Sequence, residues 1–179
     1  MSRVGIKGVD SLTKRFNNIS SMDLKEVVNR ATALVHGQAK ELAPVGITGD
    51  LGGSIHMSVE EKGNTIEGSV YTNKEYAMYV EFGTGIKGNG TYPYDVKDLS
   101  LEYASSPWYI PVDKMDAETA ERYHFPKVQG KNGAEYYVCH GQEAQPYMYP
   151  ALADNSKLIR QMFKNTVISK LKENCKGGQ

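Results

Sequence analysis

One stretch of this sequence constrains the fold more than any other: between Asp23 and Leu42, apolar residues recur at helical spacing. They form one stripe along a helix of about five turns, and they are Leu24, Val27, Val28, Ala31, Leu34, Val35, Ala39 and Leu42. Asp23 is suited to cap the N-terminus, and Pro44 ends the helix. Since only one side of this helix is apolar, it must pack against another element, which we expect to be a sheet.

The residues that follow predict that sheet. From Ser54 to Glu60 apolar and polar residues alternate, which places Ile55, Met57 and Val59 on one face of a strand. A short turn leads into a second strand from Thr65 to Thr72. The two strands therefore predict an antiparallel hairpin.

A second amphipathic helix is predicted at the C-terminus, beginning near Pro150, a residue favoured in the first turn. Its apolar stripe consists of Leu152, Ile159, Met162, Phe163, Val167 and Leu171. The expected elements between the hairpin and this helix are a short helix or turn at Lys74–Phe82, strands at Trp108–Val112 and Ala134–His140, and one helical turn at Ala117–Arg122. A short strand at Val4–Val9 and a short helix at Asp10–Ile19 are expected before the long helix.

The predicted fold class is therefore α+β: a small antiparallel sheet packed by a long N-terminal helix and a C-terminal helix, with a long loop and strand insertion. A chain of 179 residues suits a single domain, spanning residues 1–179. The insertion is residues 86–143, since 86–106 is rich in Gly, Asn, Tyr, Asp and Ser with little periodicity. We expect it to be partly ordered.

Composition argues against several classes of function. Lysine plus arginine equals aspartate plus glutamate at 21 each, so no overall positive charge attracts DNA or an anionic membrane. Apolar runs stay short of the roughly 20 residues of a membrane span, and the first residues lack the apolar segment of a signal peptide. The sequence therefore predicts a cytosolic protein. Cys139 and Cys175 form neither a disulfide framework nor a CxxC pair.

No residue pattern predicts catalysis, a metal or a cofactor. None of His36, His56, His124 and His140 has a second histidine or a cysteine three or four residues away. Cys139 and His140 are adjacent and would point to opposite faces of a strand, so they cannot act as a nucleophile and its base. The turn Gly83-Thr84-Gly85 precedes a loop, whereas a phosphate cradle needs a helix N-terminus there. We expect no catalytic, cofactor-binding or metal-binding residues.

Three short blocks, in this order, resemble the tail-completion or minor tail-component family of long-tailed phages, also described as head-tail joining proteins. The first is Ala39-Lys40-Glu41-Leu42-Ala43-Pro44-Val45, continuing through Thr48-Gly49-Asp50-Leu51 to Ser54-Ile55. The second is Tyr76-Ala77 with Tyr79-Val80-Glu81-Phe82-Gly83-Thr84-Gly85. The third is Gly141-Gln142 with Gln145-Pro146-Tyr147-Met148-Tyr149-Pro150-Ala151-Leu152. Each block alone is weak, whereas three in order are specific.

The resemblance implies an α+β fold, no enzymatic activity, and a place in the neck of the virion, where the tail meets the head. Such a protein would assemble with identical copies into a ring through a heterologous interface, and a hexamer is implied because phage tail tubes are sixfold. The implied partners are other copies of the chain, the tail tube or terminator, head-connector proteins and, in passing, genomic DNA. Assembly would take place in the host bacterial cytoplasm. A tail terminator or head-closure ring is the alternative role.

Aromatic residues supply most of the candidate subunit contacts. The chain has 12 tyrosines against 4 phenylalanines and 1 tryptophan, and every tyrosine lies at or after Tyr71. Tyrosine combines a large contact area with a polar tip, which suits surfaces that become buried between subunits. The candidate interface residues are Tyr79, Glu81, Phe82, Tyr92, Tyr94, Trp108, Tyr147 and Tyr149.

Two functions of other classes stay open. An enzyme, for instance a phage-encoded hydrolase, would use Asp113, Asp116, Glu118, Glu121, His124 and His140, whose spacing is typical of a solvated surface. A nucleic-acid-binding protein would use the basic residues of the last helix, which are Lys157, Arg160, Lys164, Lys170, Lys172 and Lys176. Asp154 and Glu173 partly offset that positive charge, and no aromatic residues on which bases could stack are interleaved with it.

Overall fold

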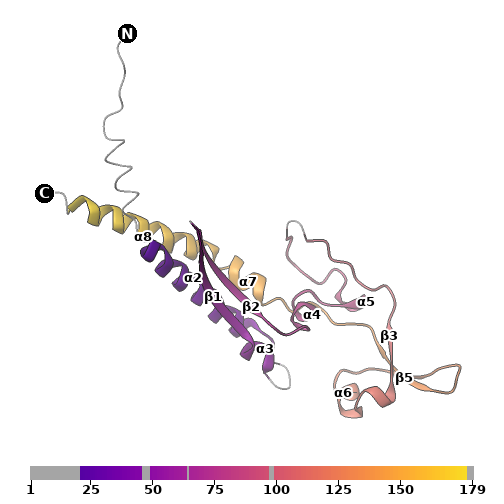
Figure 1. Ribbon diagram of the computed structural model, residues 1–179. Coiled ribbons are helices and arrows are strands. Elements are labelled where there is room, and N and C mark those ends of the chain that lie inside the picture. The colour runs from indigo at the N-terminus through magenta and orange to yellow at the C-terminus, as the bar shows by residue number, and fades with distance from the viewer. Residues whose placement is uncertain (1–20, 46–48, 64, 97–98, 177–179) are drawn as a thin grey trace, which may run out of the picture. The chain divides into compact units, whose positions relative to one another are not determined.

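A computed structural model of the protein describes residues 21–45, 49–63, 65–96 and 99–176 (Figure 1). The strand expected at Val4–Val9 and the helix expected at Asp10–Ile19 lie outside these residues. The chain divides into two compact units. Unit 1 combines Met1–Asn73 with Met148–Gln179, and unit 2 is the intervening segment Lys74–Tyr147. Unit 2 therefore contains all of residues 86–143.

The long helix and the hairpin of unit 1 are confirmed. Helix α2 spans Ser21–Leu42 and is followed by the short helix α3, Asp50–Gly53. Strands β1 (Ile55–Lys62) and β2 (Thr65–Thr72) pair antiparallel along their full length, from Ile55 opposite Thr72 to Lys62 opposite Thr65. The alternation in the sequence thus gave the correct strands and the correct pairing.

One face of the hairpin packs on α2. Gly68 lies on this face, and a methyl group added to it would collide with Oγ1 of Thr32 and approach Cγ1 of Val28, both on α2. Val59 pairs with Gly68 across the hairpin, so it shares that face. The buried residues of unit 1 include Val27, Ala31, Val35 and Ala39 from α2, and Leu51 and Ile55 from the segment after it.

The C-terminal helix differs from the prediction of one continuous helix near Pro150. It is two helices, α7 (Met148–Ala153) and α8 (Ser156–Lys176), separated by a turn. Asn155 in this turn is buried, and its Nδ2 donates to the Ala151 carbonyl at 2.8 Å and to Oε1 of Gln38 at 3.1 Å. An asparagine side chain that bonds to the preceding turn favours a break in the helix. The break leaves Leu152 55 % exposed, so its place in the apolar stripe was predicted wrongly.

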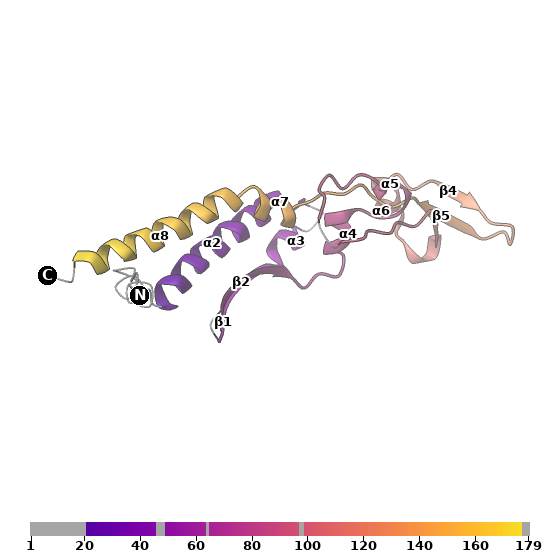
Figure 2. The ribbon, with the colours of Figure 1, turned by 90° about the horizontal axis from the view of Figure 1, so that it is seen from above.

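Helix α2 lies between the hairpin and α8 (Figure 2). The rest of the predicted stripe of α8 is half-buried, namely Ile159, Met162, Phe163, Val167 and Leu171. Unit 1 is therefore an α+β arrangement of hairpin, long helix and C-terminal helix, and the predicted fold class is confirmed. No described helix is both long enough and apolar enough to cross a membrane.

Unit 2 consists of short elements around a second small sheet. They are α4 (Ala77–Phe82), α5 (Gly85–Gly88), β3 (Trp108–Pro111), the 3-10 helix η1 (Val112–Lys114), α6 (Ala117–Arg122), β4 (Lys127–Gln129) and β5 (Glu135–Cys139). The sheet is antiparallel in the order β3-β5-β4. The expected strands at Trp108 and Glu135 and the helical turn at Ala117 are confirmed. Strand β4 was missed, since its three residues are all exposed and show no alternation.

Candidate functional site

The described residues contain no group of three or more His, Cys, Asp or Glu side chains placed to hold a metal ion. Two histidines make contacts within unit 1. Nε2 of His36 lies 3.0 Å from the Ile55 carbonyl, and the ring of His56 lies 5.9 Å from that of Tyr71. With no such cluster among the described residues, the candidate functional features are the backbone pairing between two segments of unit 2 and the exposed surfaces of each unit.

Two segments of unit 2 that are far apart in sequence pair with each other, and we call them the clasp: residues 79–91 and 140–147. Thr84 and Gln142 form an antiparallel bridge in which each backbone N–H donates to the other's carbonyl, at 2.9 and 3.1 Å. Lys87 N–H donates to the His140 carbonyl at 3.0 Å, and Gln145 N–H donates to the Val80 carbonyl at 2.8 Å. The second and third sequence blocks thus meet in the clasp.

Glu81 is the buried centre of the clasp. Its side chain is 5 % exposed, and its Oε2 accepts from the backbone N–H of Tyr147 at 2.8 Å. Tyr147 is 1 % exposed, and burial, with a smaller contribution from the Glu81 carboxylate and Tyr76, raises the pKa of its phenol to about 12. A carboxylate that accepts from a buried N–H satisfies a donor that would otherwise be costly to bury.

Glycines permit the close backbone approach in the clasp. A methyl group on Gly85, whose φ is +61°, would lie 2.7 Å from the His140 carbonyl oxygen and 2.9 Å from the Trp108 ring. Gly141, at φ +86°, has the backbone of Thr84 where its methyl group would be. Only glycine fits such positions without a shift of the backbone. The Gly83-Thr84-Gly85 motif therefore serves packing between two chain segments.

The structure separates the eight candidate interface residues into groups. Glu81 and Tyr147 are buried in the clasp. Phe82, Tyr92 and Tyr94 form an aromatic cluster, with ring centroids 5.0 Å apart for the first two and 5.6 Å for the last two. Tyr79 and Trp108 are exposed, at 53 % and 43 %, and Tyr149 in α7 is half-buried.

The three-stranded sheet of unit 2 has one face of apolar and aromatic residues, with Tyr109 and Val128 exposed, that the candidate residues missed. Tyr109 pairs with Val138 and Val128 pairs with Tyr136, so these four side chains share one face. Tyr109 is 61 % exposed, and the four residues line a concavity of about 630 Å³ together with residues 129–132. The alternation around Trp108 could have identified Tyr109, whereas no sequence signal identified Val128.

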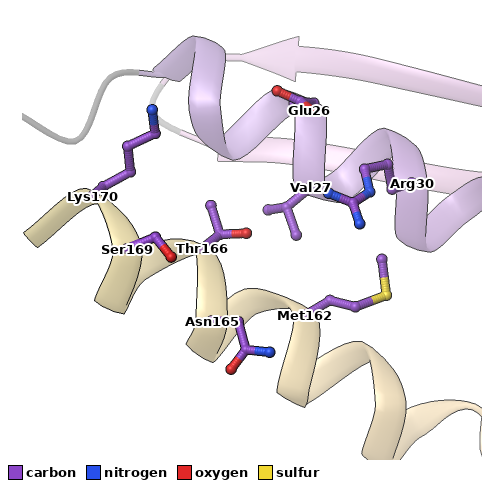
Figure 3. A pocket seen from close by; sticks show the side chains of 8 residues that line it. All are labelled: Glu26, Val27, Arg30, Met162, Asn165, Thr166, Ser169 and Lys170. Carbon is purple, nitrogen blue, oxygen red and sulfur yellow. The ribbon is translucent and has the colours of Figure 1, made fainter. Parts of the chain in front are cut away.

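Unit 1 has a groove of about 340 Å³ between α2 and α8 (Figure 3). Its lining is mixed in character and consists of Glu26, Val27, Arg30, Met162, Asn165, Thr166, Ser169 and Lys170. Because the lining lacks a cluster of convergent ligands, the groove has the character of an imperfectly filled helix contact.

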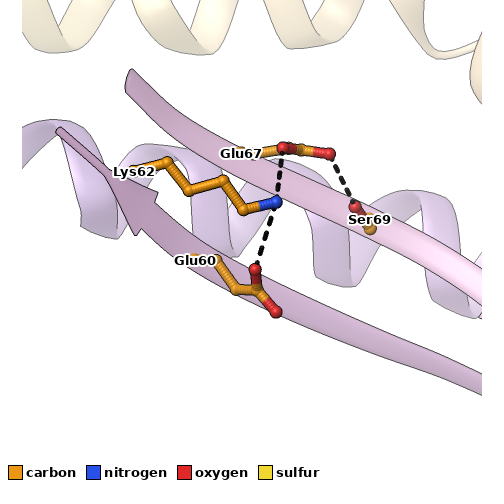
Figure 4. A network of polar contacts seen from close by, with 4 residues as sticks. All are labelled: Glu60, Lys62, Glu67 and Ser69. Atoms are coloured by element: carbon orange, nitrogen blue, oxygen red, sulfur yellow. Dashed lines mark hydrogen bonds and ion pairs between the residues drawn. The ribbon is translucent and has the colours of Figure 1, made fainter. Parts of the chain in front are cut away.

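The outer face of the hairpin, turned away from α2, is polar and charged (Figure 4). Nζ of Lys62 lies 3.1 Å from Glu67 and 3.2 Å from Glu60. The hydrogen bond to Glu67, followed by that to Glu60, raises the pKa of Lys62. This face is open to solvent in the described chain and is available to a partner.

Comparison with known proteins finds similarity in the first half of the chain. No curated protein and no solved structure gives a significant match. A family described as "Bacteriophage HK97-gp10, putative tail-component" matches residues 6–83. These residues include α2, the hairpin and α4, and they carry the first sequence block and most of the second. Over residues 6–83 the chain is therefore similar to the HK97-gp10-like family of phage tail components, in agreement with the resemblance found in its sequence.

Proposed function

We propose that this chain is a structural protein of the virion that completes the tail or joins it to the head, and that it works by assembling into a ring. The observation that carries this proposal is the match of residues 6–83 to a phage tail-component family. The ring is a hexamer that lies between the head connector and the tail tube. A tail terminator or a head-closure ring is the alternative position in the same part of the particle.

The chemistry of the carboxylates supports a structural role and the absence of enzymatic activity. Asp116 caps α6 by accepting from the Thr119 N–H at 2.7 Å, a contact that lowers the pKa of this carboxyl. Glu118 pairs with Arg122 at 2.9 Å within the same helix. These side chains stabilise a short exposed helix, and neither is directed at a shared reaction centre.

The exposed aromatic residues are proposed contacts to other subunits. Tyr79, Trp108 and Tyr109 expose large apolar surfaces, and aromatic side chains of this kind are enriched in protein interfaces. Glu81 and Tyr147 act from inside unit 2, since the clasp fixes the segment that bears Tyr79. Phe82, Tyr92 and Tyr94 in unit 2, and Tyr149 in unit 1, are half-buried and are proposed as further contacts.

The partners in this proposal are other copies of the chain, the tail tube or terminator, and head-connector proteins. DNA passes through the ring during injection and makes only passing contact, because the chain carries equal numbers of positive and negative side chains. Assembly takes place in the bacterial cytoplasm and the finished location is the neck of the virion.

A nonsense mutation in the phage or prophage that encodes the chain tests this proposal. Electron microscopy should show DNA-filled heads and separate tails, and expression of the wild-type chain in trans should restore joined particles. Expression of a chain with Cys139→Ser and His140→Gln should restore them equally. Joined, infectious particles in the absence of the chain would contradict the proposal, and failure of the double variant despite normal incorporation would favour an enzyme.

A further inference from the structure

Helix α8 presents cations on the side turned away from α2. Met162 and Thr166 of this helix line the groove toward α2 (Figure 3). The exposed side chains on the remaining sides include Lys157, Arg160, Lys164 and Lys172. None of these four takes part in an ion pair with another residue of the described chain, and the ion pair that α8 does contain joins Lys170 to Glu173. This surface, with the exposed Ile168, is called the outer face of α8.

The outer face of the hairpin carries the opposite charge. Glu60 and Glu67 lie opposite each other in the strand register and share the single ammonium group of Lys62 (Figure 4). Two carboxylates and one ammonium leave this end of the outer face with a net negative charge.

The two outer faces also match in the position of their apolar residues. On the hairpin, Tyr71 is 48 % exposed and lies four residues from Glu67, about 13 Å along the strand. On α8, Ile168 is 39 % exposed and lies eleven residues from Lys157, about 16 Å along the helix. A contact between Tyr71 and Ile168 is therefore compatible with an ion pair between Glu67 and Lys157 in the same docking orientation.

The two faces lie on opposite sides of unit 1, because α2 separates the hairpin from α8 (Figure 2). Two different, complementary surfaces on opposite sides of a subunit produce a head-to-tail contact, which closes into a ring when the rotation per copy divides a full turn. We propose that the outer face of the hairpin in one copy binds the outer face of α8 in the next copy. This inference rests on the proposed ring and identifies the interface that closes it.

Reversing the charge of each face separately, and then of both faces together, tests the interface. One variant carries Lys157→Glu and Lys164→Glu, and a second carries Glu60→Lys and Glu67→Lys. Each should raise the protein concentration at which the ring half-dissociates by roughly tenfold or more, because like charges then face each other. Lys25→Glu with Lys40→Glu, at two exposed positions of α2, is the matched control and should leave the ring unchanged. Circular dichroism should show the same helix content and melting in all variants.

Combining the two pairs of substitutions, in one chain or as a mixture of the two variants, should restore assembly. A chain with all four substitutions has both charges exchanged and should form rings alone. An equimolar mixture of the two variants should also form rings, with alternating copies, provided that the number of copies is even. Light scattering coupled to size exclusion measures each case.

The outcomes separate the interface from the ring itself. A wild-type chain that stays monomeric at every concentration contradicts the ring as well as the interface. Wild-type rings that tolerate both reversals contradict the interface alone. Rings that persist in the α8 variant while its retention on a DNA column is lost would assign the cations of α8 to nucleic acid, and this result too would overturn the interface.

Discussion

Glu81 and Tyr147 are separated by 66 positions in the sequence and joined by a hydrogen bond from the Tyr147 backbone N–H to Oε2 of Glu81. The bond connects α4 to the segment that ends unit 2. It therefore helps to close the unit at the point where the chain leaves it.

Replacement of Glu81 by alanine should lower the free energy of unfolding of unit 2 by about 1–3 kcal/mol, because the buried Tyr147 N–H loses its acceptor. Glu81→Gln keeps an acceptor oxygen and should retain more of the stability. The single tryptophan, Trp108, lies in unit 2, so urea unfolding followed by tryptophan fluorescence measures this unit. Equal midpoints for the alanine variant and the wild type would contradict the role assigned to Glu81.

The contact between the hairpin and α2 depends on the absence of a side chain at Gly68. Gly68→Ala should destabilise unit 1 by about 1–3 kcal/mol, because the added methyl group meets Thr32 and Val28. Gly37→Ala should have the opposite effect on stability. The added methyl group meets nothing within 4 Å, and the substitution removes a glycine from the interior of α2. It should stabilise the unit by about 0.5–1 kcal/mol. Thermal melting followed by circular dichroism would show opposite shifts, and shifts of the same sign would refute the packing.

The phenol of Tyr147 should make stability fall at high pH. Its pKa is about 12 in the folded chain against 10.0 normally, so the folded state binds more protons between these values. The stabilising contribution is fully present below pH 10 and is lost as the pH rises to about 12. Tyr147→Phe should therefore show a shallower loss of stability over this window than the wild type. Parallel curves from pH 10 to 12 would be inconsistent with a buried, protonated phenol.

The segment between Gly88 and Ser106 should be cut by protease in the isolated chain and protected in the assembled neck. In its described part beyond Thr91 it contains no helix or strand, although Tyr103 donates a hydrogen bond to the Phe82 carbonyl at 2.8 Å. Its aromatic residues suit an interface that orders on contact with a neighbour. Limited proteolysis before and after assembly measures this. Equal cleavage in both states would remove this segment from the proposed interface.

Elements with a strong local pattern were predictable from the sequence. The stripe of α2 and the alternation in β1 reflect burial on one side of a helix and one face of a strand, and this burial has a fixed period in sequence. The turn at Asn155 was not predictable in the same way, because its side chain bonds to Gln38, 117 residues away. A break that depends on such a tertiary contact leaves no local period.

The clasp was only partly predictable. The sequence singled out its blocks separately and named Glu81 and Tyr147 as candidate interface residues, whereas the structure joins the two by a buried hydrogen bond inside unit 2. The pairing of Thr84 with Gln142 could not be inferred, because it joins two irregular segments 58 residues apart without alternation. The apolar sheet face at Val128 was missed for a related reason, since β4 is short and exposed.

The mass of the assembled chain tests the ring most directly. Native mass spectrometry of the purified wild-type chain, over a range of concentrations, should show one dominant assembly with six times the mass of the chain. A closed ring gives a single mass, whereas an open head-to-tail contact gives a ladder of increasing masses. A monomer at all concentrations, or an open ladder, would contradict the account.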